Sequence, residues 1–210
     1  YGRFLSASFD NAEGKNTLTG KGLTCNKGVA VKLGNGEGAM LFDTDLCRMA
    51  GGWVGGWLKL KGVAFDGAHG PNPGPPKDAQ ILFQTNPGPT WSKGTDFNDP
   101  RALPKGLGAA KVPFGPLPQD WARYRGLFVH GDKVIVSYTV GTAGLLEMPS
   151  LEKVNDLPVL TRTFNVTNAG PAANCILFEA DGAKLEIKDA VAIVNTDAKN
   201  PEKRVVIAVT

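Results

Sequence analysis

The sequence predicts an all-β domain, a sandwich of two packed sheets whose mostly antiparallel strands are joined by long loops rich in glycine and proline. First, 27 glycines and 15 prolines make up a fifth of the 210 residues, a composition that favours short strands and turns over helices. Second, short apolar or alternating segments recur about every ten residues between turn signals, which is the spacing of β-sandwiches. No segment has a helical periodicity beyond about two turns, so we expect no helix longer than about three turns. A super-sandwich with additional strands fits the same pattern.

The strands expected in the first half are short. The glycine-rich segment Gly34–Gly38 is a tight turn between two apolar runs, which predicts a hairpin. Leu58–Val63 alternates apolar and polar residues, the pattern of a half-buried strand. The expected strands lie at Arg3–Phe9, within Leu23–Leu33, and at Ala39–Phe42, Leu58–Val63 and Ile81–Thr85.

Loops occupy the middle of the chain. Pro71–Lys77 cannot form regular structure, because each proline fixes φ and removes a hydrogen-bond donor. Asn86–Gly115 is unusually long for a loop in a compact domain, so it is either functional or a flexible decoration. Pro118–Tyr124 is expected to form one helical turn. We treat residues 1–210 as a single β-rich domain with a sub-boundary near 116–120.

The second half continues the series of strands. Gly126–Val140 predicts two strands around the turn His130-Gly131-Asp132. The later strands are expected at Leu145–Met148, Val159–Val166, Cys175–Glu179, Leu185–Ile187, Val191–Val194 and Arg204–Val209.

Charge and motifs argue against several function classes. The net charge of +3 comes from 23 basic and 20 acidic residues that are interspersed, so a nucleic-acid partner is not indicated. No stretch approaches the roughly 20 apolar residues of a membrane span. His69 and His130 are the only histidines, and no CxxC or CxxCH occurs, so neither a zinc site nor covalent haem is expected in this chain. Hydrolase, metalloprotease and nucleotide-binding motifs do not occur either.

Asp43 and Asp45 form the first candidate site. On an extended chain, two carboxylates two residues apart point to the same face. Such a pair repels unless it shares a cation or lies beside a basic group, and Arg48 is the nearest base. Two interpretations remain open, namely a Ca²⁺ or sugar-hydroxyl site and a turn in which the aspartates accept local backbone N–H groups.

The second candidate site uses aromatic residues. Trp53 and Trp57 lie in the segment GGWVGGW, where glycines either expose a ring to a ligand or allow close backbone packing. Stacked tryptophans suit sugar rings, although large aromatic residues are usually buried. Asp66 and His69 share a glycine-bounded loop and Trp91 lies in the long loop. We expect Asp43, Asp45, Trp53, Asp66, His69 and Trp91 to converge at one edge of the sandwich.

Several segments together resemble a known domain. They are LFDTDLCRMAGGWVGGWLKLKGVAFDGAHG, ILFQTNPGPTW, PFGPLPQDWARYRGLFVHGDKVIVSYTVG, LLEMP and LTRTFNV. The resemblance covers about residues 1–166 and is to an N-terminal domain, without an assigned activity, of large secreted planctomycete-type proteins. Those proteins also carry c-type haem-binding domains and sorbosone-dehydrogenase-like domains.

The resemblance implies a secreted or periplasmic location and a chain that is a piece of a longer multidomain protein. Any haem would then belong to associated domains, and Ca²⁺ is the one cofactor considered for this chain. An oxidising compartment also implies a disulfide between Cys25 and Cys47, with Cys175 left as a buried thiol.

Three functions follow from these observations. The first is a non-catalytic carbohydrate-recognising module that uses Trp53, Trp57, Asp66, His69 and Trp91. The second is a structural domain that packs against a cytochrome or another subunit of the same assembly. The third is a glycan-active enzyme domain with a carboxylate pair drawn from Asp43, Asp45 and Asp66.

Overall fold

The computed structural model describes residues 2–9, 23–69, 72–103, 105, 113, 115–170, 174–180, 182–195 and 204–210. Within these residues the chain forms three antiparallel sheets and no helix, which confirms the all-β prediction. In each sheet the strands are neighbours in chain order. Among the described residues, no helix has the length and apolar character needed to cross a membrane.

The five-stranded sheet comes first in the chain. It contains β1 (Phe4–Phe9), β2 (Cys25–Leu33), β3 (Gly38–Asp43), β4 (Arg48–Val54) and β5 (Gln80–Gln84). The four-stranded sheet contains β6 (Ala122–His130), β7 (Lys133–Val140), β8 (Ala143–Val154) and β9 (Leu157–Thr167). The three-stranded sheet contains β10 (Lys184–Lys188), β11 (Val191–Asn195) and β12 (Arg204–Ala208).

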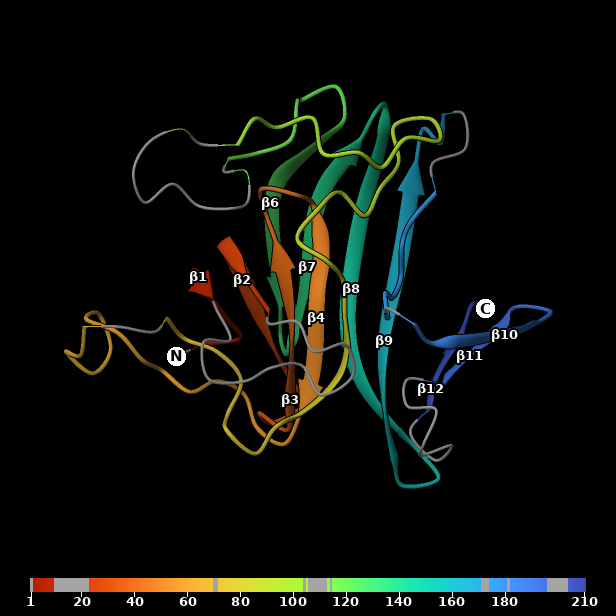
Figure 1. Ribbon diagram of the computed structural model, residues 1–210. Coiled ribbons are helices and arrows are strands. Elements are labelled where there is room, and N and C mark those ends of the chain that lie inside the picture. The colour runs from red at the N-terminus through yellow and green to blue at the C-terminus, as the bar shows by residue number, and fades with distance from the viewer. Residues whose placement is uncertain are drawn as a thin grey trace.

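The two larger sheets face each other and enclose the main core (Figure 1). Alternate residues of each strand point inward, so Val31 of β2 and Met40 of β3 meet Val136 of β7 in one apolar cluster. Gly52 allows a close approach across this core, because a Cβ built there would lie 2.5 Å from Cδ1 of Leu160. A glycine in the segment GGWVGGW therefore serves packing.

A second apolar cluster, here named the outer cluster, lies on the other face of the five-stranded sheet. Its buried residues are Phe9, Leu23, Cys25, Ala30, Ala39, Leu41, Ala50, Trp53 and Ile81. It explains why all six residues of β3 are buried, since Ala39 and Leu41 point into this cluster while Met40 and Phe42 point between the sheets. The segment after β4 contributes Trp57 and Leu58 to the cover. Burial on both faces hides the alternating pattern of a half-exposed strand.

The expected strand Leu58–Val63 is wrong. Gly55 and Gly56 adopt φ values of 94° and 129°, which turn the chain away from β4. Only Lys59 then makes a β-type pair, an isolated bridge to Gly74. The alternation of Leu58, Lys59 and Leu60 reflects a loop with one side on the outer cluster.

Other elements were predicted with mixed success. The hairpin at Gly34–Gly38 and the turn between His130 and Lys133 are confirmed. Pro118–Tyr124 forms a single turn in which the N–H groups of Trp121 and Ala122 donate to the Pro118 carbonyl, not a helix. The expected strand Cys175–Glu179 is wrong, because Cys175 makes only an isolated bridge to Trp91.

The three-stranded sheet stands to the right of β9 in Figure 1, outside the two-sheet sandwich. Residues that are opposite each other in an antiparallel pair share a face, so the register divides the sheet into two faces. One face, here named the apolar face, consists of Leu185 and Ile187 of β10, Ala192 and Val194 of β11, and Val205 and Ile207 of β12.

Candidate functional site

A buried ion pair between Asp43 and Arg48 closes the turn between β3 and β4. The two residues are opposite each other in the sheet, and Asp43 Oδ2 lies 3.2 Å from Arg48 Nη2, with at most 5% of either side chain exposed. Asp43 Oδ1 also accepts the N–H groups of Asp45 at 3.0 Å and Leu46 at 3.3 Å. The Asp43 carboxylate therefore satisfies local backbone donors, as one of the two sequence interpretations proposes.

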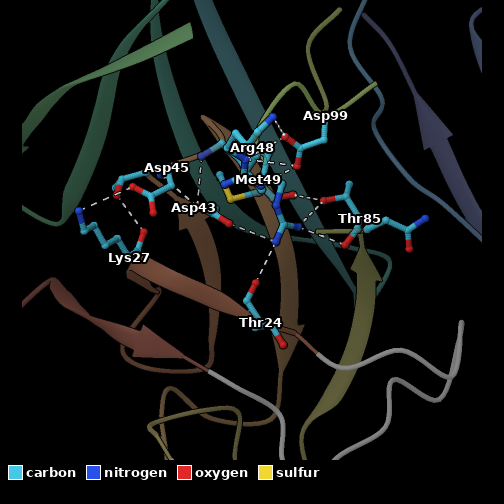
Figure 2. Close-up of polar contacts among 12 residues, drawn as sticks. Thr24, Lys27, Asp43, Asp45, Arg48, Met49, Thr85 and Asp99 are labelled. Carbon is cyan, nitrogen blue, oxygen red and sulfur yellow. Dashed lines mark hydrogen bonds and ion pairs between the residues drawn. The ribbon is translucent and has the colours of Figure 1, made fainter. Parts of the chain in front are cut away.

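The Arg48 guanidinium joins three segments of the five-stranded sheet (Figure 2). Its Nη1 donates to the Thr85 carbonyl at 3.2 Å and to Thr85 Oγ1 at 2.9 Å. Its Nη2 donates to the Thr24 carbonyl at 2.9 Å. Thr24 precedes β2 and Thr85 follows β5, so Arg48 ties the ends of these strands to the turn. A buried cation with a paired carboxylate and three further hydrogen bonds is a structural clamp.

Asp45 lines a small cavity beside the clamp. Only 9% of its side chain is exposed, and its carboxylate lies 3.9 Å from Lys27 Nζ. Burial, followed by the negative charge of Asp43, raises the pKa of Asp45. The cavity holds about 20 Å³, which is room for roughly one water molecule. Its polar lining also includes Thr24, Asn26 and Arg101.

Positive and negative charges balance around this cavity. Arg101 holds Asp99 in a two-pronged ion pair, with Nη2 2.7 Å from Oδ2 and Nε 2.9 Å from Oδ1. Burial raises the pKa of Asp99, but the hydrogen bonds and the positive charge of Arg101 outweigh burial and hold it below its usual range. Within the described residues, no group of three or more His, Cys, Asp or Glu side chains is placed to hold a metal ion. A Ca²⁺ site at Asp43 and Asp45 stays a prediction.

The expected disulfide between Cys25 and Cys47 is wrong, because both residues are thiols. Their side chains lie on opposite faces of the five-stranded sheet. Cys25 belongs to the outer cluster with Phe9, whereas Cys47 belongs to the core between the sheets with Met49. Burial, followed by the charge of Asp43, raises the pKa of both thiols, so neither is a reactive thiolate at neutral pH. Cys175 is also a thiol, but is only partly buried.

A second buried ion pair lies in the four-stranded sheet. Glu147 of β8 is 0% exposed. Its Oε1 accepts Arg162 Nε of β9 at 2.6 Å, and its Oε2 accepts the Tyr138 hydroxyl of β7 at 2.7 Å. The Arg162 guanidinium also lies 5.0 Å from the centre of the Phe164 ring. The sequence carried a signal for this cluster, since Glu147 and Arg162 interrupt apolar strands, but sequence reasoning missed it.

The surroundings of this second pair shift the pKa values of Tyr138, Arg162 and Cys175. Burial and then the Glu147 charge raise the pKa of Tyr138. For Arg162, burial lowers the pKa, but the charge of Glu147 outweighs burial and keeps the guanidinium protonated. Burial raises the pKa of the neighbouring Cys175 thiol to about 11. The cluster therefore places two neutral groups, Tyr138 and Cys175, beside the Glu147–Arg162 ion pair, which suits a packing role.

Residues 40–147 match the family model DUF6797, a domain of unknown function. The chain belongs to the DUF6797 family. Neither a curated protein nor a solved structure matches this chain. The DUF6797 region runs from Met40 in β3 to Glu147 in β8, so it contains facing strands of both large sheets.

The DUF6797 region contains the Asp43–Arg48 clamp and the carboxylate of the second ion pair. Arg162, the cation of that second pair, lies beyond the region, as does Thr24, a partner of Arg48. The polar networks therefore connect the family region to the strands on both sides of it.

The tryptophans of the DUF6797 region do not form an open platform. Trp53 is 0% exposed in the outer cluster, and its Nε1 donates to the Trp57 carbonyl at 2.8 Å. Trp57 is half-buried with Lys32 Nζ 5.4 Å from its ring centre. Trp91 packs against Tyr138 and Phe164, with ring centres 6.4 and 6.1 Å away.

The structure brings together Asp43 and Asp45 but not the other candidate residues. Trp53 is five residues along β4 from Arg48, a separation of roughly 17 Å. Asp66 and His69 are exposed in the segment that leaves the far end of β4 (Figure 1). Asp66 Oδ1 accepts the N–H groups of Gly62 and Ala68, both at 3.0 Å. Their roles in ligand binding stay predictions, without a common site to support them.

Proposed function

We propose that this chain is a structural docking domain of a larger extracytoplasmic protein, and that the apolar face of β10–β12 packs against another folded domain of the same polypeptide. One observation carries the proposal. Leu185 and Ile187 are 58% and 70% exposed on that face, although all six of its side chains are apolar. Val191 and Val206 are also exposed large hydrophobic side chains, but they lie on the opposite face of the sheet.

An apolar sheet face of this kind is stabilised when another element packs on it and removes it from water. Three-stranded sheets gain their stability from packing one apolar face against another element. Among the described strands, those of this sheet make extensive contact only with each other, although Val194 is 6% exposed and Ala192, Val205 and Ile207 are half-buried. The uncovered end of the face, at β10, is therefore a surface for a partner.

The size of the face favours a tethered partner. Three strands spaced about 4.8 Å apart and five residues long present roughly 250 Å². A stable interface between separate proteins buries roughly 1,200 Å² or more in total, whereas a domain on the same chain has an effective concentration of about millimolar. The resemblance to secreted multidomain proteins supports the location and supplies candidate partners, the haem-binding and sorbosone-dehydrogenase-like domains.

The test compares variants of the natural full-length protein. Ile187→Lys places a charge on the apolar face, and we expect faster proteolysis of the interdomain linkers and a larger radius of gyration in small-angle scattering. Val63→Lys is the matched control, since Val63 is 64% exposed on a loop. Wild-type behaviour of the Ile187→Lys protein in both measurements would contradict the proposal.

Carbohydrate recognition is a second proposal, favoured by the cavity at Asp45. The cavity is lined by Asp45, Asn26, Thr24 and Arg101, residue types whose side chains bind sugar hydroxyls. Its volume admits one hydroxyl, so a sugar would lie across the mouth. Calorimetry with glycans on wild type and Asn26→Ala tests this, and the absence of binding to wild type would exclude it.

A further inference from the structure

We propose that two copies of this chain pair through the free edges of their β12 strands and form one continuous six-stranded antiparallel sheet. The proposal concerns the edge of the three-stranded sheet and does not depend on what covers its apolar face. It rests on the register of the strands, on which backbone groups point outward, and on the charges at the two edges.

The register identifies the backbone groups that β12 presents at its edge. The Val209 N–H donates to the Ala190 carbonyl, so the pairs Val205–Val194 and Ile207–Ala192 also bond toward β11. Hydrogen bonding alternates along an antiparallel strand. The N–H and C=O groups of Arg204, Val206 and Ala208 therefore point away from β11. Among the described strands, β12 makes extensive contact only with β11.

This edge is complementary to itself. In a two-fold pair centred on Val206, each Val206 bonds to its counterpart, and each Arg204 faces Ala208 of the other copy. All three outward residues then exchange both of their backbone hydrogen bonds. On the apolar face, Val205 lies opposite Ile207 of the other copy, a favourable cross-strand pair. No like charges are opposed, and the apolar faces of both copies become continuous.

The other edge of the sheet, at β10, is less suited to pairing with itself about the centre of its strand. Two β10 strands paired about their centre would place Glu186 opposite Glu186 and Lys184 opposite Lys188. Like charges directly opposite each other destabilise a sheet, and charged residues are a common protection of edge strands. With pairing through the β12 edge alone, assembly closes at two copies and does not continue into a fibre.

Position and side-chain exposure favour access to β12. The sheet lies outside the two-sheet sandwich (Figure 1), and Val206 is 63% exposed. Pairing over five residues buries much less than a stable interface of roughly 1,200 Å². We therefore expect a weak dimer, with a Kd on the order of 100 µM.

The test exploits the two-fold position of Val206. Val206→Lys places two lysines opposite each other in the dimer and Val206→Glu places two glutamates there, so each variant alone should dimerise at least about tenfold more weakly than wild type. An equimolar mixture opposes lysine to glutamate and should restore the affinity to within about threefold. Sedimentation velocity of the whole chain from about 10 µM to 1 mM compares the four Kd values, those of wild type, the two single variants and the mixture.

A matched control and the contrary results complete the design. Glu186→Lys on the β10 edge should leave the dimer unchanged. Restoration in the mixture also shows that both Val206 variants are folded. A wild-type protein that is monomeric at 1 mM would overturn the proposal. So would single variants that dimerise like wild type, or a mixture that stays monomeric.

Discussion

Replacing Arg48 by methionine should remove a large part of the stability of the domain. The change breaks the 3.2 Å contact with Asp43 and removes donors to Thr85 and Thr24. It leaves the Asp43 carboxylate buried without a cation. Loss of one partner of a buried ion pair costs roughly 3–5 kcal/mol, a substantial share of the roughly 5–15 kcal/mol that stabilises a typical domain.

Urea unfolding at 25 °C, followed by circular dichroism, measures this change in the free energy of unfolding. The matched control is Lys153→Met, because Lys153 forms a 3.3 Å pair with Glu37 in which both side chains are more than half exposed. Such a pair contributes about 0–1 kcal/mol. The double variant Asp43→Asn with Arg48→Met should lose less than Arg48→Met alone, since asparagine still accepts the turn N–H groups without a charge.

A loss below about 1 kcal/mol for Arg48→Met would refute the clamp. It would mean that the turn between β3 and β4 is held by its backbone and by the Asp43 hydrogen bonds alone. An equal loss in the single and double variants would show that the buried carboxylate does not need the arginine.

Three further predictions test the interior. Trp53→Ala should lower the free energy of unfolding by about 3–5 kcal/mol in the same urea assay because it empties a core site, and a loss below about 1 kcal/mol would contradict burial. Thiol titration in denaturant without reductant should find all three cysteines reactive, and a count of one would restore the Cys25–Cys47 disulfide. The raised pKa of Tyr138 means that unfolding releases its proton above about pH 10, so stability should fall as the pH rises past that value. Absorbance at 295 nm should then show Tyr138 ionising only with unfolding, and its ionisation in the folded protein near pH 10 would contradict the Glu147 contact.

Local signals predicted the turns and many of the strands. The glycines of Gly34–Gly38 and of the Gly131-Asp132 turn predict hairpins correctly, because the turn of a hairpin is determined by a few neighbouring residues. The pattern underestimated β8 and β9, which pair over eleven positions. Glu147 and Pro149 interrupt the apolar pattern of β8, and only the partner Arg162 on β9 explains why a carboxylate is buried there.

The candidate site was less predictable, because it depends on which face of a sheet is covered. Trp53 lies on the face that would be open if the segment after β4 did not fold over it, and sequence alone does not show that cover. The face to which each side chain points also decides whether the cysteines can form a disulfide. Cys25 and Cys47 point to opposite sides of one sheet, so they cannot. The turn interpretation of Asp43 could be reached from sequence, because its hydrogen bonds involve residues only two and three positions away, whereas the Ca²⁺ interpretation stays a prediction.

The docking proposal is tested most directly by a photo-cross-linking amino acid placed at Ile187 in the natural full-length protein. The proposal predicts that irradiation joins residue 187 to a peptide of the same polypeptide that lies outside residues 1–210, identified by mass spectrometry. The same probe at Val63, an exposed loop position, should give no such product. Equal labelling patterns at the two positions, or no cross-link from residue 187 beyond this domain, would contradict the proposal that the apolar face of β10–β12 binds a neighbouring domain.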